Sequence, residues 1–581
     1  MGVFYGATRT EATTGVAAKI AVASREIDFL RMSAVRGCGQ IAMSFARQSQ
    51  LFFAAFTLAG LTACASDTPP PPGDFGSGSV GGFAGAVAAD EPRAVLVARD
   101  VLSGGGSAAD AAVAAYFTMA VTLPSTAGLG GGGACLVHDA KKKTVEAIVF
   151  LPLASPDGQF GLPVNIRGMA LLQARHGRLH WAELLGPAED LALHGSAISR
   201  ALAREIVTAG DKLRGDPELA RIFVAPDGHL LGEGENLVQP ELGSIIGQVR
   251  IRGAGDFYVG GVAQRMVGFA QAAGWQLSAD TLRNALPQAV DPIAISSGGQ
   301  AIYFTPPPAD GGLVAAQLLA LLTQAKNWND ASSAERPHLF VEASMRVLAE
   351  RSHWLQPGGA SATAPADLLS ESHLESMMNG YSPDRATAAS ALNPPPAPSH
   401  AENPWAASLV TVDKQSNAVA CNVTMNDLFG TGRMIPGTGV ILSPPPNQTG
   451  QDPFNLGPVL VTGHNNGSFY FAAAASGGVT APTAIAQVFL DSIIGQQPLE
   501  QAVVAGRIHH NGEPDVVFHE PNTDQSVLQS LTDQGHGLQQ ADILGRVQAI
   551  WCPRAVENLK TGCQAKADPR GDGLSVVLQG Q

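Results

Sequence analysis

Charged residues are scarce in this chain. Asp, Glu, Lys and Arg make up 15% of its 581 residues, and acidic residues outnumber basic ones, 50 to 36, for a formal net charge of −14. The sequence contains no long basic run. A protein that binds nucleic acid needs a basic stripe, because it must displace the counterions that surround the phosphates. The composition therefore excludes nucleic acid as a partner.

Hydrophobic segments long enough to span a membrane are also missing. The apolar run at residues 51–63 follows Arg47 and is too short to cross the roughly 30 Å core of a bilayer as a helix. Its length suits the hydrophobic region of a signal peptide, although a core helix is an alternative. The run ends in Leu61-Thr62-Ala63-Cys64, which resembles a bacterial lipobox. That resemblance implies cleavage before Cys64 and lipid on its thiol, whereas a plain secretory signal would leave no anchor.

These features predict an exported protein. We expect residues 1–63 to be upstream sequence plus a lipoprotein signal peptide, with the true start at or near Met32 or Met43. Residues 64–87, rich in Pro, Gly and Ser, read as a tether. The lipid on Cys64 would hold the protein on the periplasmic side of a bacterial membrane, with the outer membrane favoured.

Cysteine is rare, with six residues in the whole chain. Cys38 lies in the segment expected to be removed, and Cys64 is the predicted lipidation site. Cys552 and Cys563 are close in sequence and could form a disulfide in an oxidising periplasm; two free thiols are the alternative. Cys135 and Cys421 lie in apolar, strand-like runs and are expected to be buried as small hydrophobic residues.

Metal-ligand patterns are missing as well. The sequence has no CxxC pair and no His/Cys cluster, so no metal and no cofactor are expected. His509 and His510 are adjacent, and adjacent residues of a strand point to opposite faces of a sheet. We therefore expect both histidines to be structural.

Helices and strands alternate along the chain in a pattern that favours helices covering sheets. Predicted helices lie at 94–102, 111–119, 199–213, 262–273 and 338–354, with another beginning at Leu313. Predicted strands lie at 134–138, 145–150, 301–305, 407–412, 418–424, 440–442 and 469–474. The fold class is therefore α+β or α/β with layered sheets.

A series of motifs identifies a family. In the first part of the chain these are Gly105-Gly106-Ser107-Ala108-Ala109-Asp110, Gly128-Leu129-Gly130-Gly131-Gly132-Gly133, Phe257-Tyr258-Val259-Gly260, Gly311-Gly312 and Glu342-Ala343. In the second part they are Asn426-Asp427-Leu428-Phe429-Gly430-Thr431-Gly432, Gly437-Thr438-Gly439, Ser476-Gly477-Gly478, Arg507-Ile508-His509-His510 and Asp568-Pro569-Arg570. Their order resembles the gamma-glutamyltranspeptidase (glutathione hydrolase) family from about Ala88 to Val577.

This resemblance implies an N-terminal-nucleophile hydrolase: an α+β fold in which four layers form an αββα sandwich. It also implies a precursor that cuts itself into two subunits. The corresponding regions here are residues 88–405, similar to the large subunit, and residues 406–581, similar to the small one. In such enzymes a Thr hydroxyl attacks the peptide bond before it, and its freed amine then acts as general base. A Gly-Gly turn stabilises the oxyanion, and the pocket needs both a cation and an anion to bind the zwitterionic γ-glutamyl group.

Several of the residues that this chemistry requires are replaced. In the family the nucleophile lies seven residues before an Asp at the end of a strand, and here that strand end is Val412-Asp413. Glu402 upstream and Asn426 downstream fix the same register. The nucleophile position is therefore Ala406. The position of the substrate-binding Arg is Leu151, and that of the ammonium-binding Asp falls at or near Gln448. The paired Ser residues of the family read Phe454-Asn455. From the active-site set, Asn426 and the oxyanion turn Gly477-Gly478 are retained.

Two hypotheses follow. The first is an uncut, lipid-anchored pseudoenzyme with a binding or structural role toward a ligand or protein. The second is an active γ-glutamyltransferase or glutathione hydrolase that acts on γ-glutamyl amides with a rebuilt site. A shift of register could recruit Ser408 or Thr411, but the two residues from Ala406 to Ser408 already displace a hydroxyl by roughly 6–7 Å. A misplacement of about 1 Å already costs a reaction heavily. We therefore favour the pseudoenzyme.

Overall fold

The computed structural model describes residues 83–325, 328–356, 358–392, 405–446, 455–554 and 562–579. All of them belong to one compact unit, Gly78–Gln581. Cys64, Gln448 and Phe454 lie outside the described residues, as do the predicted signal region and most of the predicted tether. Among the described residues, no helix combines the length and hydropathy needed to cross a membrane.

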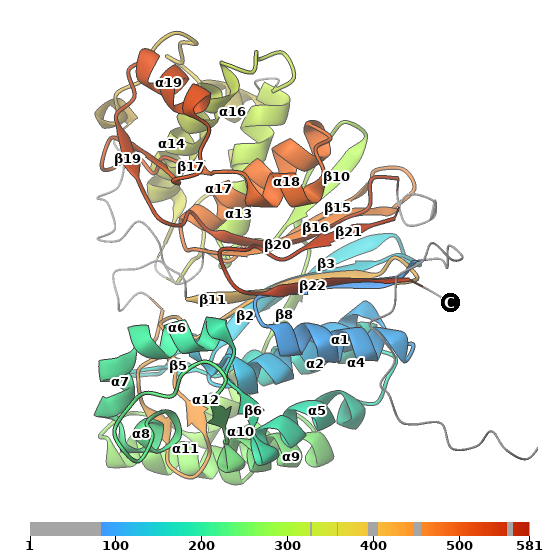
Figure 1. Cartoon of the computed structure of the whole chain (residues 1–581), viewed down its shortest axis with the longest axis vertical. Helices are drawn as coiled ribbons and strands as arrows, with labels where there is room; N and C mark the ends of the chain where they lie inside the picture. The colour runs from blue at the N-terminus through green and yellow to red at the C-terminus, as the bar shows by residue number, and fades with distance from the viewer. Residues whose placement is uncertain are drawn as a thin grey trace, which may run out of the picture. The chain divides into compact units, whose positions relative to one another are not determined.

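Two stacked sheets form the centre of this unit (Figure 1). The seven strands of the first sheet are, in spatial order, β22 (Leu574–Gln579), β1 (Phe83–Ala89), β11 (Ala406–Asp413), β12 (Ala418–Thr424), β2 (Gly132–Asp139), β3 (Thr144–Phe150) and β8 (Gln288–Val290). The six strands of the second are β21 (Gln564–Lys566), β20 (Arg546–Trp551), β16 (Phe469–Ser476), β15 (Val459–Gly463), β10 (Gln300–Phe304) and β9 (Ile293–Ser297). The pairings within both sheets are antiparallel.

Helices cover both outer faces, so the layers follow the order α, β, β, α (Figure 1). On the first sheet lie α1 (Pro92–Ser103), α2 (Ala108–Thr122) and α4 (Asn165–His176), with α5 (Trp181–His194), α6 (Arg200–Thr208), α7 (Gly210–Gly215), α8 (Pro217–Phe223), α9 (Pro240–Arg252), α10 (Asp256–Val259), α11 (Gly261–Ala272) and α12 (Ala279–Asn284) around them. On the second lie α13 (Gly311–Ala320), α14 (Arg336–Trp354), α16 (Glu371–Met377), α17 (Thr480–Phe489), α18 (Leu499–Val504) and α19 (Gln525–Asp533). The predicted four-layer sandwich is confirmed.

Local sequence explains why these elements form. In β11, Ala407 and Leu409 pack against the helices, while Val410 and Val412 pack between the sheets, as the two-residue period of a strand requires. Helix α2 starts with a capping box in which Ser107 and Asp110 bond each other's backbone N–H groups. Its small side chains are buried on all sides, which lets it lie between the sheet and the outer helices.

Two predicted boundaries are corrected. The helix predicted at 199–213 is two helices, α6 and α7, because Ala209 leaves helical geometry and a new helix begins at Gly210. The predicted tether ends earlier than expected, because β1 begins at Phe83 and pairs with β11 and β22.

The cysteines form two disulfides. The predicted Cys552–Cys563 bridge is confirmed. The prediction that Cys135 and Cys421 are simply buried hydrophobic residues is wrong, because they too are bonded to each other. They lie directly opposite each other on the neighbouring strands β2 and β12. This bond joins residues 286 positions apart, on either side of the 405/406 junction.

Candidate active site

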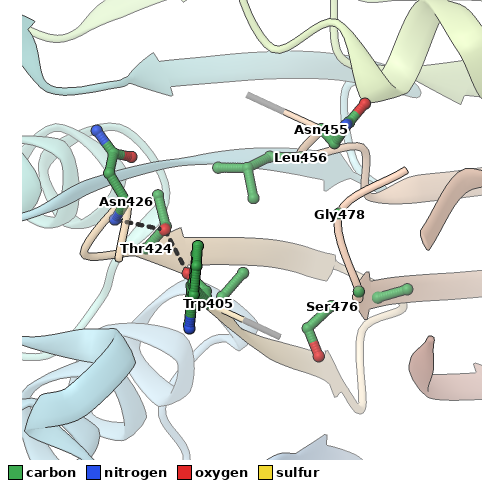
Figure 2. A pocket seen from close by; sticks show the side chains of 10 residues that line it. Trp405, Thr424, Asn426, Asn455, Leu456, Ser476 and Gly478 are labelled. Atoms are coloured by element: carbon green, nitrogen blue, oxygen red, sulfur yellow. Dashed lines mark hydrogen bonds between the residues drawn. The ribbon is translucent and has the colours of Figure 1, made fainter. Parts of the chain in front are cut away.

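Ala406 is the first residue of β11, directly after Trp405, and pairs with Thr424 of β12. Its position in the strand matches that of Ser408, Val410 and Val412, so its methyl group points toward the second sheet. There it lines a small pocket with the Gly477-Gly478 turn at the end of β16 (Figure 2). The pocket offers about 20 Å³ to the centres of water molecules, which is room for about one water.

Ten described residues line this pocket, and none of them carries an ionisable side chain. They are Trp405, Ala406, Thr424, Asn426, Asn455, Leu456, Ala475, Ser476, Gly477 and Gly478. The structure thus brings together five of the predicted site residues: Ala406, Asn426, Asn455, Gly477 and Gly478.

One side of the pocket is apolar. Leu151 is 5% exposed and Leu456 is 4% exposed, and both belong to a buried hydrophobic cluster against which Ala406 packs. Leu151 therefore lies beside Ala406, the predicted nucleophile position, and it stands where the family resemblance predicts a cation for the substrate carboxylate. A leucine there leaves a carboxylate without a partner, and burying a charge unpaired is strongly unfavourable.

The other side of the pocket is polar but uncharged. Asn426 is held by its own N–H, which donates to Thr424 Oγ1 at 2.9 Å, and by its Nδ2, which donates to the Pro444 carbonyl at 3.2 Å. Its Oδ1 has no partner among the described residues, and neither do the two amide atoms of Asn455 or the Ser476 hydroxyl. The three side chains are 1–4% exposed. Unsatisfied buried polar atoms are costly, so they mark places where water or a ligand binds.

Glycine is required at the Gly477-Gly478 turn. Gly477 has φ +137° and Gly478 has φ +60°. A Cβ atom on Gly477 would lie 2.6 Å from Thr480 Oγ1 and 2.7 Å from the Gly545 Cα atom. The turn leads into α17, and the Thr480 hydroxyl donates to the Gly477 carbonyl at 2.9 Å. The Gly477-Gly478 turn therefore lines the same pocket as Ala406, and its role as an oxyanion turn stays a prediction.

Comparison with known proteins shows the family to which the chain belongs. The gamma-glutamyltranspeptidase family model matches residues 94–578. The chain belongs to the gamma-glutamyltranspeptidase family. It is 27% identical over 577 residues to the glutathione hydrolase proenzyme of Escherichia coli, covering 87% of this chain and 98% of that protein. It is also 27% identical over 523 residues to glutathione hydrolase 3 of Arabidopsis thaliana, covering 80% of each.

A solved structure shows the same fold. Cephalosporin acylase from Bacillus halodurans superimposes with a TM-score of 0.73 at 23% identity, covering 89% of this chain and all of the acylase. At that identity the likeness concerns the architecture alone.

Other hydroxyl groups near Ala406, the predicted nucleophile position, are hydrogen-bonded elsewhere or have no ionisable side chain beside them. Ser408 is fully buried between the sheets, and its Oγ accepts from Asn422 Nδ2 at 2.9 Å. Thr411 points to the opposite face and donates to the Ala108 carbonyl at 2.7 Å. Ser476 lines the pocket, but no ionisable side chain lines it with Ser476. A serine hydroxyl is a weak nucleophile unless a neighbouring base takes its proton.

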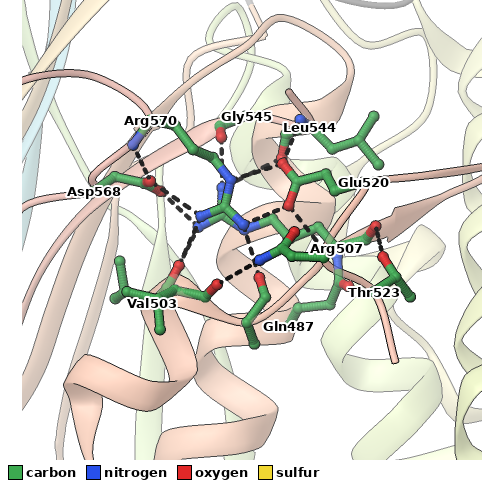
Figure 3. Close-up of polar contacts among 12 residues, drawn as sticks. Gln487, Val503, Arg507, Glu520, Thr523, Leu544, Gly545, Asp568 and Arg570 are labelled. Atoms are coloured by element: carbon green, nitrogen blue, oxygen red, sulfur yellow. Dashed lines mark hydrogen bonds and ion pairs between the residues drawn. The ribbon is translucent and has the colours of Figure 1, made fainter. Parts of the chain in front are cut away.

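A buried charge cluster surrounds Arg507 and Arg570 and contacts Gly545 (Figure 3), which lies against Gly477. Arg507 donates to the carbonyl of Gly545 and, at 2.6 Å, to Asp568. Arg570 donates to Asp568 at 3.1 Å and to Glu520 at 2.7 Å. Burial disfavours the charge of Asp568, but the two guanidinium groups and the Val547 N–H outweigh burial and hold the pKa of its carboxyl below the ordinary value. Arg507, Asp568 and Arg570 belong to the motifs that the sequence shares with the family, whereas Glu520 lies outside them.

The two adjacent histidines have separate structural partners. Strand β17 (Ile508–His509) ends before His510, so the two are not strand neighbours as predicted. His509 Nδ1 shares a hydrogen bond of 2.9 Å with Thr483, and His510 Nε2 lies 3.3 Å from Asp515. Burial lowers the pKa of both imidazoles, that of His509 to about 3.

Among the described residues, one group has side chains suited to a metal ion: His338, Glu342 and His536, whose ligand atoms lie within 4.8 Å of one another. Each already has a protein partner. His338 donates through Nε2 to the Ser382 carbonyl at 2.8 Å and shares a 2.7 Å hydrogen bond with His536. Glu342 is ion-paired with Arg346. Neutral imidazoles satisfy this arrangement without an ion, and the expectation of no metal stays a prediction.

Proposed function

We propose that this protein is an exported, lipid-anchored member of the family that is not cleaved and does not transfer γ-glutamyl groups. Its pocket, which has room for about one water, instead takes a water or the polar tip of an uncharged ligand. The observation that carries the proposal is the pocket lining, which combines Ala406 with no ionisable side chain among the described residues. A methyl group can neither attack a peptide bond nor accept a proton.

The ligand class follows from the unsatisfied atoms. Asn455 offers a free donor and a free acceptor, and Asn426 and Ser476 each offer an oxygen. The apolar side formed by Leu151 and Leu456 excludes a charged group. A single amide or hydroxyl group at the tip of a ligand matches this combination, whereas the zwitterionic head of a γ-glutamyl compound would leave two charges unpaired.

The experiment that tests the proposal is a gel of the purified protein under reducing conditions. Reduction is essential, because the Cys135–Cys421 bond would hold two fragments together after a cut at the 405/406 junction. We expect a single band and no release from a γ-glutamyl anilide. Two fragments with a new N-terminus near Ala406, together with turnover of the anilide, would instead establish an active enzyme with a rebuilt site.

A pair of variants separates self-cleavage from transfer. Ala406→Thr restores the hydroxyl and should at most allow slow self-cleavage, because that step needs only the local strand, a hydroxyl and water. Transfer should stay absent, since Leu151 leaves the substrate carboxylate unpaired. Ala406→Val is the matched control, because valine has the shape of threonine without the hydroxyl. Rapid transfer by Ala406→Thr would contradict the argument from the apolar side of the pocket.

The anchor has its own test. Cys64→Ser should move the protein from the membrane fraction to the soluble fraction, because one residue carries the lipid. A Cys64→Ser protein that stays with the membrane after a high-salt wash would refute lipid anchoring.

A further inference from the structure

The end of the sandwich opposite the pocket carries an unusual concentration of positive charge. Of the six lysines among the described residues, four lie there: Lys141, Lys142, Lys143 and Lys414. Three belong to the turn between β2 and β3, and Lys414 belongs to the turn between β11 and β12. The whole chain carries a net charge of −14, so this clustering runs against its overall composition.

Hydrogen bonds hold these turns together. The Ala140 N–H donates to Asn417 Oδ1 at 3.0 Å. The His138 ring contacts the Ser416 carbonyl at 2.8 Å and the Gly467 carbonyl, in the turn between β15 and β16, at 2.9 Å. One histidine therefore ties turns of both sheets into a single surface, and the lysines are displayed on a fixed support.

A broad hollow of about 660 Å³ lies in this surface. Its charged lining residues are Asp139, Lys141, Lys143, Arg175 and Arg178, together with His176. We call Lys141, Lys142, Lys143, Lys414, Arg175 and Arg178 the basic edge.

The nearby carboxylates neutralise half of the basic edge. Asp139 pairs with Lys142 at 2.7 Å, Glu146 with Arg175, and Asp413 with Arg178 at 3.4 Å. These three pairs leave Lys141, Lys143 and Lys414 exposed, with no ion pair inside the described part of the chain. An excess of three positive charges therefore faces solvent.

The chain enters the sandwich at this same edge. Strand β1 begins at Phe83, and Gly85 pairs with Asp413, so Phe83 lies level with the turn that carries Lys414. Only 19 peptide units separate Cys64 from Phe83, so the fully extended reach is at most roughly 65 Å. Ala406 lies at the other end of β11, an eight-residue strand about 25 Å long.

We propose that the basic edge docks on the anionic lipid headgroups of the membrane that anchors the chain, and so turns the pocket away from the bilayer. This inference rests on the proposed anchor at Cys64. Each basic residue near an anionic bilayer strengthens attachment by about fivefold. Three unpaired lysines therefore strengthen attachment about 100-fold, which is weak alone but effective for a protein already held by lipid.

The test uses the chain from Ala65 onward, which includes the whole compact unit Gly78–Gln581 and lacks the anchor. Sedimentation with phosphatidylglycerol vesicles at low salt should carry the protein down, and phosphatidylcholine vesicles should not. Binding should disappear at about 0.5 M salt, because screening shortens the reach of each charge to a few ångströms. Equal binding to both lipids, or none to phosphatidylglycerol, would overturn the proposal.

Two matched variants locate the surface. The triple change Lys141→Glu, Lys143→Glu and Lys414→Glu should weaken binding to phosphatidylglycerol by more than about 100-fold. The control changes Arg200, Arg252 and Arg283 to Glu, which alters the net charge equally at residues that are 57–65% exposed on the helical layer. The control should still bind. An equal loss in both variants would show that net charge alone matters and refute the basic edge.

The vesicle assay and the lipidation test can fail separately. In cells, the full chain with the lysine changes should remain in the membrane fraction through Cys64, whereas Cys64→Ser alone tests lipidation. Vesicle binding without lipidation would refute the anchor only, and lipidation without vesicle binding would refute the docking surface only.

Discussion

Replacing Asp568 by Asn should destabilise the protein more than almost any other isosteric change. Asp568 is 1% exposed. Its carboxylate accepts hydrogen bonds from Arg507, from both the backbone and the side chain of Arg570, and from the Val547 N–H at 2.8 Å. The cluster of Figure 3 contains two guanidinium groups and two carboxylates, so its charges balance. A neutral amide in place of the Asp568 carboxylate would leave one buried positive charge without compensation.

The expected loss is about 3–5 kcal/mol in the free energy of unfolding, the range measured when one partner of a buried ion pair is removed. This is a large part of the roughly 5–15 kcal/mol that stabilises a typical domain. The effect should also reach the pocket, because Arg507 holds the Gly545 carbonyl and Gly545 lies against Gly477.

Urea denaturation followed by tryptophan fluorescence measures the loss. The matched control is Glu500→Gln, which removes one partner of the exposed pair between Glu500 and Lys566. The control should not shift the midpoint measurably, because exposed ion pairs contribute little. A loss below about 1 kcal/mol for Asp568→Asn, or an equal loss for both variants, would refute the assignment of this cluster as the support of the turn.

The pH dependence provides a second check. The folded pKa of Asp568 is lowered, so its ionised form stabilises the protein above the ordinary Asp pKa of about 4. That stabilisation is lost as the pH falls through the folded value. The difference between wild type and Asp568→Asn should therefore shrink below about pH 4, and a constant difference would contradict the linkage.

Two further predictions concern the buried histidines and the long-range disulfide. Burial lowers the pKa of His509 to about 3 and that of His536 to about 4. The folded protein therefore disfavours protonation of these imidazoles, and its free energy of unfolding decreases as the pH falls below about 6.5. At about pH 5 the expected loss is about 2 kcal/mol for each imidazole. Thermal unfolding should show this loss between about pH 7 and about pH 5, and His536→Gln should reduce it by about 2 kcal/mol; an unchanged pH dependence would contradict the burial argument. Removing the Cys135–Cys421 bond with two serines should cost more stability than removing Cys552–Cys563, about 5 against about 3 kcal/mol, because the closed loop is longer. Thiol labelling of the unfolded protein should find four more reactive sulfurs after reduction.

Short-range features of the sequence predicted a large part of the fold. Helix α2 begins at its Ser107 cap, and β11 and β12 follow their apolar runs within a residue or two. The order of motifs predicted the family and the sandwich. The position of Ala406 followed from counting along one strand, and the structure places it beside the Gly477-Gly478 turn. The Cys552–Cys563 bond was predictable because its partners lie 11 residues apart. Helix and strand propensities, helix caps and short loops depend on residues close together in the chain, so a single sequence is enough to predict them.

Features that depend on sheet order could not be read in this way. Cys135 and Cys421 pair because β2 and β12 are neighbours, although 286 residues separate the two cysteines. Leu456 joins Leu151 beside Ala406 because the second sheet lies over the first. Lys414 lies at the same edge as the lysines of the β2–β3 turn because β11, β12, β2 and β3 are consecutive in the sheet. The sequence by itself determined which side chains are present and which are lost, whereas the tertiary structure decided which of them meet, because antiparallel pairing across long loops depends on the packing of the whole core.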